Sequence, residues 1–378
     1  MPDYNEKSLS KHQELKGKIS ITTKDTLDSR DKLSIYYTPG VGAVSSYLAQ
    51  HPNELRNFTW THNLVAVISD GSAVLGLGNI GAEAALPVME GKAMIFKDFA
   101  SIDAVPIVLN VHTAEEIISA VKAIAPSFGG INLEDIAAPV CFEVEDALAH
   151  ILPIPVMHDD QHGTAIVTLA GLINAIKLKH MNIQQCRIVI TGAGAAGVAI
   201  SKLLFKYGAR NIVAVDSKGI VSRRRTDLNE SKQRLLDYVD KDSDGSLSDA
   251  VRGADIFIGV SQPNILSPEL VQSMAQDPII FAMANPVPEI MPDVAFKAGA
   301  YIIATGRSDF PNQINNALAF PGIFRGALDF NVRQITDEHK IAAAEAIAAL
   351  VDNPKPDNIV PTVFDKRLVG AVSSVFKR

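Results

Sequence analysis

The chain has 378 residues, of which 47% are hydrophobic and 20% charged, and its formal net charge is −7. This size and balance are typical of a globular protein with about two domains, not of a disordered chain. The acidic net charge, with a single basic triplet at 223–225, argues against a nucleic-acid partner. Two cysteines provide no disulfide framework, and no apolar run is long enough to span a bilayer, so we expect a cytoplasmic protein that does not bind membranes.

The first 160 residues alternate between predicted helices and strands. The almost wholly apolar run at 104–110 is typical of a strand buried on both faces, and Thr113 with Glu116 forms a capping box that starts the next helix. The segment 33–42 is predicted to be extended, because a proline–glycine pair ends it. Further strands are predicted at 63–70, 73–77 and 129–134, and further helices at 8–17, 43–50, 79–90 and 144–150.

The alternation continues through the second half of the chain. A long apolar-periodic helix is predicted from Thr164 to Asn182, and an alanine-rich helix from Asp337 to Val351. Short buried strands are predicted at 187–191, 211–215, 255–260, 279–283 and 300–304, with a helix at 198–207. Because strands and helices alternate, we expect parallel sheets covered by helices.

Two glycine runs match the pattern G-x-G-x-x-G. Gly192, Gly194 and Gly197 directly follow a predicted strand and open a helix, and Asp216 ends the next strand 24 residues after Gly192. This context is that of a dinucleotide site, where glycines let a pyrophosphate approach the helix N-terminus and the acid binds the ribose. The run at 76–81 follows a predicted hairpin and lacks the acid, so its glycines are expected to serve close packing.

The fold class that follows is α/β with two domains. One is a Rossmann-type doubly wound dinucleotide-binding domain at 161–315. The other is an α/β substrate and metal domain at 1–160, which a C-terminal helical tail at 316–378 completes.

Asp216 also bears on the choice of nicotinamide cofactor. A carboxylate facing a 2′-phosphate repels it by about 4 kcal/mol at 4 Å and an effective dielectric near 20. This repulsion favours NAD over NADP. Lys218 and the triplet 223–225 lie close in sequence and weaken the argument, so NADP stays open as the alternative cofactor.

Two acidic pairs stand 25 residues apart, each directly after an apolar run. They are Glu134–Asp135 and Asp159–Asp160. Both positions correspond to carboxyl ends of strands, where open α/β sheets bind ligands. Carboxylate oxygens without cysteine or clustered histidine favour Mg²⁺ or Mn²⁺ over zinc. The simpler alternatives are an N-cap role for Asp160 and an exposed turn at Glu134–Asp135.

Four other residues are candidates on weaker grounds. Lys92 would act as a base if burial lowered its pKa, although a single lysine is most often a surface group. Tyr37 is either a proton donor or a packed ring. Asn285 and Asn315 follow predicted strands and are either ligand-binding amides or turn residues.

Taken together, these stretches resemble the malic enzymes, specifically the short bacterial form. They occur in the family's order and cover most of the chain. The matching stretches are Tyr37-Thr-Pro-Gly, Gly76–Gly81, Gly91-Lys92, Leu133-Glu134-Asp135, His158–Ala165, Gly192–Gly197, Ala284-Asn285-Pro286 and Asn315-Asn316-Ala317.

The resemblance implies a role for each candidate residue. Glu134, Asp135 and Asp160 would ligate the divalent metal. Lys92 would be the general base with Asp159 beside it, Tyr37 the general acid, and Asn285 and Asn315 would contact the substrate or the nicotinamide. The roles are carried over as a set: metal ligands Glu134, Asp135 and Asp160; catalytic residues Tyr37, Lys92 and Asp159; cofactor-binding residues Gly192, Gly194, Gly197, Asp216, Asn285 and Asn315.

The implied reaction is metal-dependent oxidation and decarboxylation of malate to pyruvate and CO₂ with reduction of NAD, in a homodimer. An oxaloacetate decarboxylase or a malolactic enzyme on the same scaffold is the alternative, and a nucleotide-sensing protein without activity is a third. Ala73 stands where larger members carry an arginine that grips the substrate carboxylate, so another cation would be needed, with Arg307 as a candidate.

Overall fold

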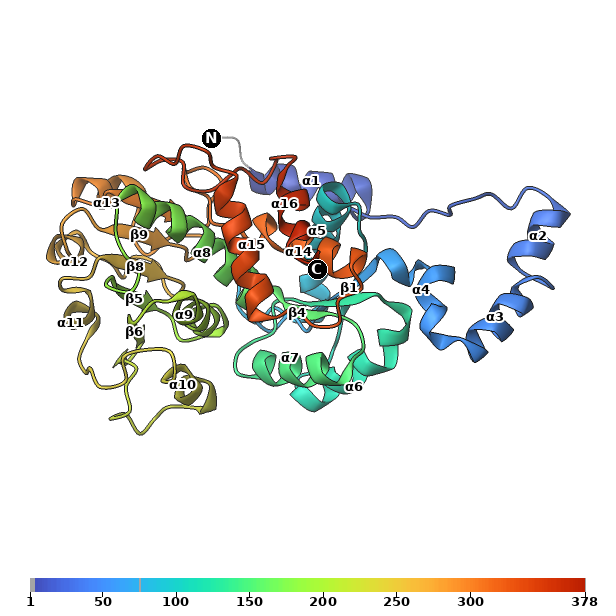
Figure 1. Cartoon of the computed structure of the whole chain (residues 1–378), viewed down its shortest axis with the longest axis horizontal. Coiled ribbons are helices and arrows are strands. Elements are labelled where there is room, and N and C mark those ends of the chain that lie inside the picture. Colours follow the sequence, from blue (N-terminus) through green and yellow to red (C-terminus); the bar gives the residue numbers. More distant parts are fainter. Residues whose placement is uncertain (1–3, 75, 378) are drawn as a thin grey trace.

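The computed structural model describes residues 4–74 and 76–377, which form two parallel sheets joined by a long helix (Figure 1). The first sheet has the strand order β2-β1-β3-β4, and all of its pairs are parallel. Its strands are β1 (Leu64–Ser69), β2 (Asp103–Val108), β3 (Gly130–Leu133) and β4 (Val156–His158). The helices α5 (Ala82–Ala100), α6 (Ala114–Ile124) and α7 (Val140–Ile151) connect them.

The central strands of this sheet are buried on both faces, which explains their continuous apolar sequence. Along β1, Leu64, Ala66 and Ile68 pack with α6 and α7. The alternate residues Val65 and Val67 pack on the opposite face with α5 and the rest of the protein. The prediction that 104–110 is buried on both faces is wrong, because β2 is the edge strand and its residues are only partly buried.

The second sheet has six strands in the order β10-β9-β8-β5-β6-β7, parallel except for the short strand β7. It confirms the doubly wound arrangement expected around the glycine fingerprint. Its strands are β5 (Arg187–Thr191), β6 (Asn211–Asp216), β7 (Gly219–Ile220), β8 (Ile256–Gly259), β9 (Ile279–Ala282) and β10 (Ile302–Thr305). Its helices are α9 (Ala195–Tyr207), α10 (Glu230–Leu235), α11 (Leu247–Val251), α12 (Pro268–Ser273) and α13 (Pro292–Lys297).

The helix α8 (Asp159–Leu178) joins the two sheets, and it begins five residues earlier than predicted. Carboxylates in a first turn are favourable to a helix, so the acidic pair Asp159–Asp160 opens α8 and does not merely precede it. The helix α5 is also longer than predicted. Its buried side chains Met89, Lys92 and Phe96 keep helical spacing straight through Gly91.

The C-terminal tail returns to the first sheet. It consists of α14 (Phe320–Asp329), α15 (Asp337–Ala349) and α16 (Leu368–Ser374). Phe320 and Phe324 of α14 pack edge-on against Phe96 of α5, with ring centroids 4.8 and 5.4 Å apart. Asn174 of α8 donates to Ala348 O and Ile359 O, which fixes the tail to the joining helix.

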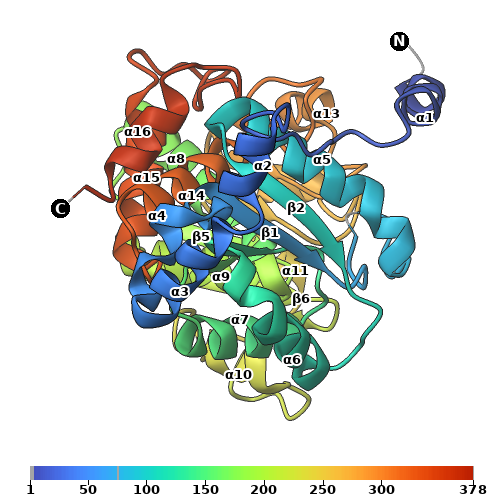
Figure 2. The ribbon, with the colours of Figure 1, turned by 90° about the vertical axis from the view of Figure 1, so that its right-hand side faces the viewer.

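An N-terminal arm projects from this body. Of its helices α1 (Tyr4–Leu15), α2 (Arg30–Tyr36), α3 (Val41–Gln50) and α4 (Leu55–Phe58), none has a buried residue. Figure 1 shows α2 and α3 standing well away from both sheets, and Figure 2 views them from their own side. The extended segment predicted at 33–42 is wrong, because Ser29 caps α2 and the helix continues to Tyr36.

The strand predicted at 73–77 is also wrong for the residues that are described there. Val74 forms an isolated bridge to Gly78 within a turn. Over the described ranges, no helix combines the length and the apolar composition that crossing a bilayer requires.

Candidate metal and cofactor site

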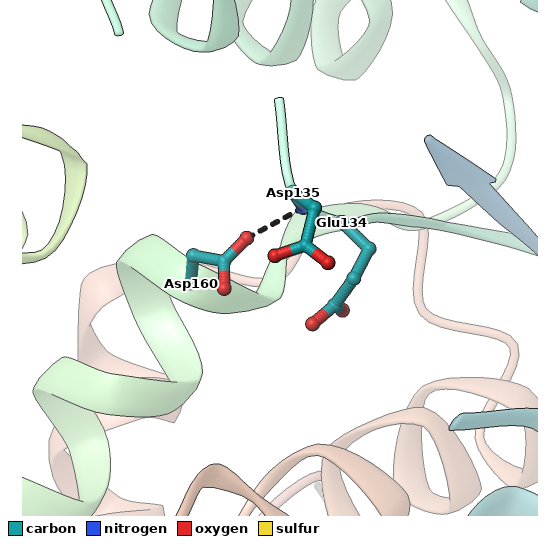
Figure 3. Close-up of side chains that lie close together, drawn as sticks. All are labelled: Glu134, Asp135 and Asp160. Atoms are coloured by element: carbon teal, nitrogen blue, oxygen red, sulfur yellow. Dashed lines mark hydrogen bonds between the residues drawn. The ribbon is translucent and has the colours of Figure 1, made fainter. Parts of the chain in front are cut away.

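The two acidic pairs meet at one edge of the first sheet. Because β3 and β4 are parallel neighbours with Leu133 opposite His158, the residues that follow each strand emerge side by side. Glu134, Asp135 and Asp160 each offer a carboxylate oxygen, and these oxygens all lie within 4.8 Å of one another. Figure 3 shows the three side chains turned toward a common point, with Asp160 in the first turn of α8.

A backbone bond holds the two pairs in place. The Asp135 N–H donates to Asp160 Oδ2 at 2.7 Å (Figure 3). Asp135 has a φ of 53°, in the left-handed region that aspartate tolerates better than most residues. The loop that follows β1 also contacts this turn. Ala73 N donates to Asp135 O, and Ala137 N donates to Ser72 Oγ.

The chemistry of these donors fits a hard divalent cation. Burial raises the pKa of Glu134, and the charge of Asp160 raises it further although Lys92 opposes the rise. Burial likewise raises the pKa of Asp160. Carboxylates that resist ionisation in this way are stabilised as anions by a cation placed among them. Oxygen donors of this kind suit Mg²⁺ or Mn²⁺.

Lys92 lies beside these carboxylates. Its Nζ is 2.6 Å from Asp159 Oδ2 and 2.8 Å from Glu134 Oε1, and it stands 4.3 Å from the centre of the Phe320 ring. Burial alone would lower the pKa of Lys92, but Asp159 and Glu134 raise it above its usual value. The expectation that burial lowers this pKa is therefore wrong while both carboxylates are paired with the ammonium group.

Asp159 completes this cluster. It is fully buried, and burial raises its pKa to about 6 against the opposing charge of Lys92. Its Oδ1 has no hydrogen-bond partner among the described residues, and neither do the two ring nitrogens of buried His158. Unpartnered buried polar atoms cost free energy, and they are typical of sites that bind a polar ligand.

The glycine fingerprint has the geometry of a dinucleotide turn. A Cβ at Gly197 would stand 1.7 Å from Gly192 O, and one at Gly192 would stand 2.6 Å from Val260 O, so the turn requires glycine at both positions. Nothing lies within 4 Å of a Cβ placed on Gly194, which leaves open space in front of the α9 N-terminus. These residues fit a bound pyrophosphate.

Asp216 ends β6 as predicted, but cations surround its carboxylate. Arg225 Nη1 donates to Oδ1 at 2.7 Å, and Lys232 Nζ donates to Oδ2 at 2.6 Å. Although burial would raise the pKa of Asp216, these bonds hold it below its usual range. Sequence reasoning noted the basic triplet but missed Lys232, whose position in a polar helix gives no signal.

The other sequence candidates are not gathered in this cluster. Tyr37 follows α2 on the projecting arm and is 66% exposed. Asn285 lies exposed in the loop after β9, and Asn315 accepts a bond from Ala317 N as the cap of a short 3₁₀ helix. Arg307 forms two bonds to Asp309, so its guanidinium is already engaged by a carboxylate.

Close packing explains one glycine of the run at 76–81. A Cβ at Gly76 would stand 3.0 Å from Asn285 O and 2.9 Å from Pro286 Cδ, so this loop of the first domain contacts the loop after β9. A Cβ at Gly78 or Gly81 would meet nothing within 4 Å, but both residues have a positive φ, 74° and 80°, which favours glycine. The expectation of close packing is therefore confirmed for Gly76 and not for the other two glycines.

Comparison with known families decides the classification. Residues 16–149 match the family model described as malic enzyme, N-terminal domain, and residues 161–373 match malic enzyme, NAD binding domain. The chain belongs to the malic enzyme family. The resemblance inferred from the sequence is thereby confirmed.

Several known proteins resemble this chain over nearly its whole length. A bifunctional malic/malolactic enzyme of Bacillus subtilis is 53% identical, with 97% of this chain and 91% of the relative aligned. An NAD-dependent malic enzyme of Geobacillus stearothermophilus is 54% identical, with 94% and 75% aligned. The crystal structure of an NAD-dependent malic enzyme from Thermotoga maritima superposes with a TM-score of 0.95 at 49% identity, covering 98% of each chain.

Neutralising one of the three carboxylates tests the metal site. We expect Asp160→Asn to weaken Mn²⁺ binding by more than about tenfold, since disturbing even an outer partner of a metal ligand costs that much. Isothermal titration calorimetry or the EPR signal of free Mn²⁺ measures the affinity. Glu115→Gln, which neutralises an exposed carboxylate on α6, is the control. Equal affinities for the two variants would contradict the assignment.

Proposed function

We propose that this malic enzyme oxidises and decarboxylates malate to pyruvate and CO₂ with reduction of NAD, at the carboxyl edge of the first sheet. Support comes chiefly from the buried cluster in which Lys92 and Asp159 adjoin the three carboxylates Glu134, Asp135 and Asp160. The dinucleotide turn lies nearby, because Ala195 beside Gly194 packs against the core cluster that contains Ile136 and Cys141.

The domain division accompanies this proposal. Residues 1–160 with 316–378 would form the substrate and metal domain, and 161–315 the NAD-binding domain, with the reaction between them. We also propose a cytoplasmic location. Both cysteines are buried and free, as is usual in a reducing compartment.

The residues have distinct tasks in this reaction. A divalent cation held by Glu134, Asp135 and Asp160 would supply positive charge that acidifies the C2 hydroxyl of malate and stabilises developing negative charge, while a bound nicotinamide would accept the hydride. Lys92 accepts the hydroxyl proton. With Glu134 engaged by that cation, Lys92 would keep only Asp159 as a carboxylate partner, which would lower the pKa of Lys92 towards that of a general base. Tyr37 returns a proton to C3 after CO₂ leaves.

A malolactic reaction is the second candidate, because the Bacillus subtilis relative is named a bifunctional malic/malolactic enzyme. Oxaloacetate decarboxylation would use the same cluster. The products distinguish these activities: reduced cofactor and pyruvate together indicate the malic reaction, lactate without free reduced cofactor indicates the malolactic one, and pyruvate from oxaloacetate alone indicates a decarboxylase.

The role of Lys92 predicts a large loss of rate on truncation. With malate, Mn²⁺ and NAD, we expect the wild-type protein to form reduced cofactor and pyruvate in equal amounts. Lys92→Ala should lower kcat by about 10²–10⁴-fold, the usual contribution of a general base. Lys97→Ala, an exposed lysine on the same helix, is the control. Near-normal turnover of Lys92→Ala would remove this residue from the mechanism.

The preference between NAD and NADP depends on the surroundings of Asp216. Its carboxylate disfavours a 2′-phosphate, but Arg225 and Lys232 neutralise much of this charge. Relatives of both kinds exist, including an NADP-dependent malic enzyme of Halomonas elongata at 45% identity. We therefore propose that NAD is preferred by a modest factor and that NADP is also used.

A substitution at Asp216 tests this balance. We expect Asp216→Ser to lower the ratio of kcat/KM for NAD over NADP by at least about tenfold, because it frees two cations to bind a 2′-phosphate. Steady-state kinetics with both cofactors measures the ratio, and Asp242→Asn, an exposed acid paired with Arg223, serves as the control. A wild-type ratio below one would refute the NAD preference.

The position of Tyr37 indicates how the active site is completed. The arm carries exposed apolar side chains, and Figure 1 places α2 far from β4 and α8. The exposed apolar residues of α2 and α3 are Leu33, Ile35, Tyr36, Val41, Val44 and Tyr47. A group of exposed apolar side chains on a projecting segment is typical of an interface. We propose a homodimer in which the arm of one copy brings Tyr37 to the Lys92 cluster of the other.

Mixing two inactive variants tests the shared site. In a heterodimer of Tyr37→Phe with Lys92→Ala, one of the two sites has both residues intact. Equal mixing after reversible dissociation should therefore restore about a quarter of the wild-type sites, given twofold symmetry and random pairing. If each chain used its own Tyr37, every site in the mixture would lack one residue and no activity would return. Light scattering checks that both variants are dimers.

A further inference from the structure

A buried carboxylate outside the metal cluster links the two segments that carry the acidic pairs. Glu145 lies on α7 and is 8% exposed. Its Oε1 accepts from His158 N at 2.8 Å, and its Oε2 accepts from Gln161 Nε2 at 3.1 Å. His162 Nε2 lies 2.8 Å from the same Oε2. All three partners flank Asp159 and Asp160 in the first turn of α8.

The α8 N-terminus lacks a cap of its own. His158 occupies the N-cap position and makes no side-chain capping bond. In an ordinary capping box, the residue at the third helical position binds the N-cap N–H. Here Gln161 holds that position, but it donates to Glu145, and Glu145 accepts the His158 N–H instead. A negative charge at this end of α8 also interacts favourably with the helix dipole.

The same carboxylate connects α8 to the C-terminal tail. His162 Nδ1 lies 3.0 Å from Lys340 Nζ on α15, and Lys340 is itself buried. Asp337 lies 3.6 Å from Lys340 and 3.2 Å from Lys202 of α9. This row of polar side chains lines a crevice of about 560 Å³ between α7, α9, α10 and α15. The first turn of α8 is thus connected through His162 to the C-terminal tail.

This arrangement matters because the metal ligands come from separate segments. Glu134 and Asp135 lie in the loop that leads into α7, and Asp160 lies at the start of α8. The two segments are linked by the bond from Asp135 N to Asp160 Oδ2, by Lys92 between Glu134 and Asp159, and by the pairing of β3 with β4. Glu145 adds a link from α7 itself to the residues on either side of Asp160. This link acts on the backbone and side chains around Asp160, and so restrains the rotation of the first turn of α8.

We propose that Glu145 is a positioning residue that holds the first turn of α8 at the place where Asp160 meets Glu134 and Asp135. The inference rests on the proposed metal-dependent function. It assigns Glu145 no contact with the substrate or the cofactor. Its effect is on the separation of the ligating oxygens, and hence on metal affinity.

Glu145→Gln tests the proposal, because it keeps the shape of the side chain but replaces one of the two acceptor oxygens that the three donors now use. We expect the dissociation constant for Mn²⁺, measured by EPR without substrate, to rise about 10–100-fold, as for other partners that orient metal ligands. NADH affinity, followed by fluorescence, should stay within about twofold, because the glycine turn is untouched. The matched control is Glu143→Gln, an exposed carboxylate on the same helix, which should behave as wild type.

Wild-type Mn²⁺ affinity in a folded Glu145→Gln variant would overturn the proposal. Equal weakening of Mn²⁺ and NADH binding would also overturn it, since that result indicates a general packing role. If Glu145→Gln does not fold, Gln161→Met decides instead, because it removes one donor and leaves the other contacts of Glu145. It should weaken Mn²⁺ binding by at least about threefold, and an unchanged affinity would refute the proposal. Failure of the wild-type protein to bind Mn²⁺ would instead reject the proposed function.

Discussion

The protein concentrates negative charge in a buried region, where unpaired charge is most costly. Four carboxylates, from Glu134, Asp135, Asp159 and Asp160, share a buried region with the single ammonium group of Lys92. At 4 Å and an effective dielectric near 20, each like-charge pair costs about 4 kcal/mol, which one lysine does not offset. A bound cation would offset this excess of negative charge, which supports the proposed metal site.

The first sheet determines where these four negatively charged side chains lie. Both β3 and β4 are short, buried and in register, so the acids that follow them emerge side by side. Lys92 arrives from α5, whose buried face runs unbroken along the same sheet. Close packing of glycine loops adds to this, since a Cβ at Gly71 would stand 2.2 Å from Gly81 O. Backbone geometry therefore sets where the acids leave the sheet, in addition to the side-chain contacts around them.

Much of the fold and site could be predicted from the sequence. The acidic pairs after apolar runs, and the glycine turn with an acid after the next strand, are local patterns tied to local structure, and the structure places them as expected. The acidic pairs themselves predicted a metal site, whereas the full ligand set and the catalytic roles came from the resemblance to a family, and all of these roles stay predictions. Neither the start of α8 nor the length of α5 was found, because Asp159 and Gly91 look like boundaries when neighbours in space are unknown.

Contacts between distant segments could not be predicted either, because the sequence alone does not show which residues are neighbours in space. Glu145 is an ordinary acid in a helical pattern, and only the folded chain shows that its carboxylate binds residues beside Asp160. Lys232 gave no sign that it would neutralise Asp216. The exposed position of Tyr37 also depends on how α2 leaves the body, which hydrophobic periodicity does not encode. Periodicity predicts which face of an element is buried, but it does not identify the partner.

The joining helix constrains how the two parts can move. The proposed boundary at 160/161 falls inside the first turn of α8, and one hydrophobic cluster runs from Val65 and Phe96 of the first part to Ile188 and Phe281 of the second. Since close-packed cores resist shear, the sheets cannot rotate about this boundary without disturbing that cluster. Glu145 lies at the crevice between α7 and α10, and its bonds reach the first turn of the same joining helix. In the proposed role of Glu145, these bonds hold Asp160 beside Glu134 and Asp135 within a core that already resists movement.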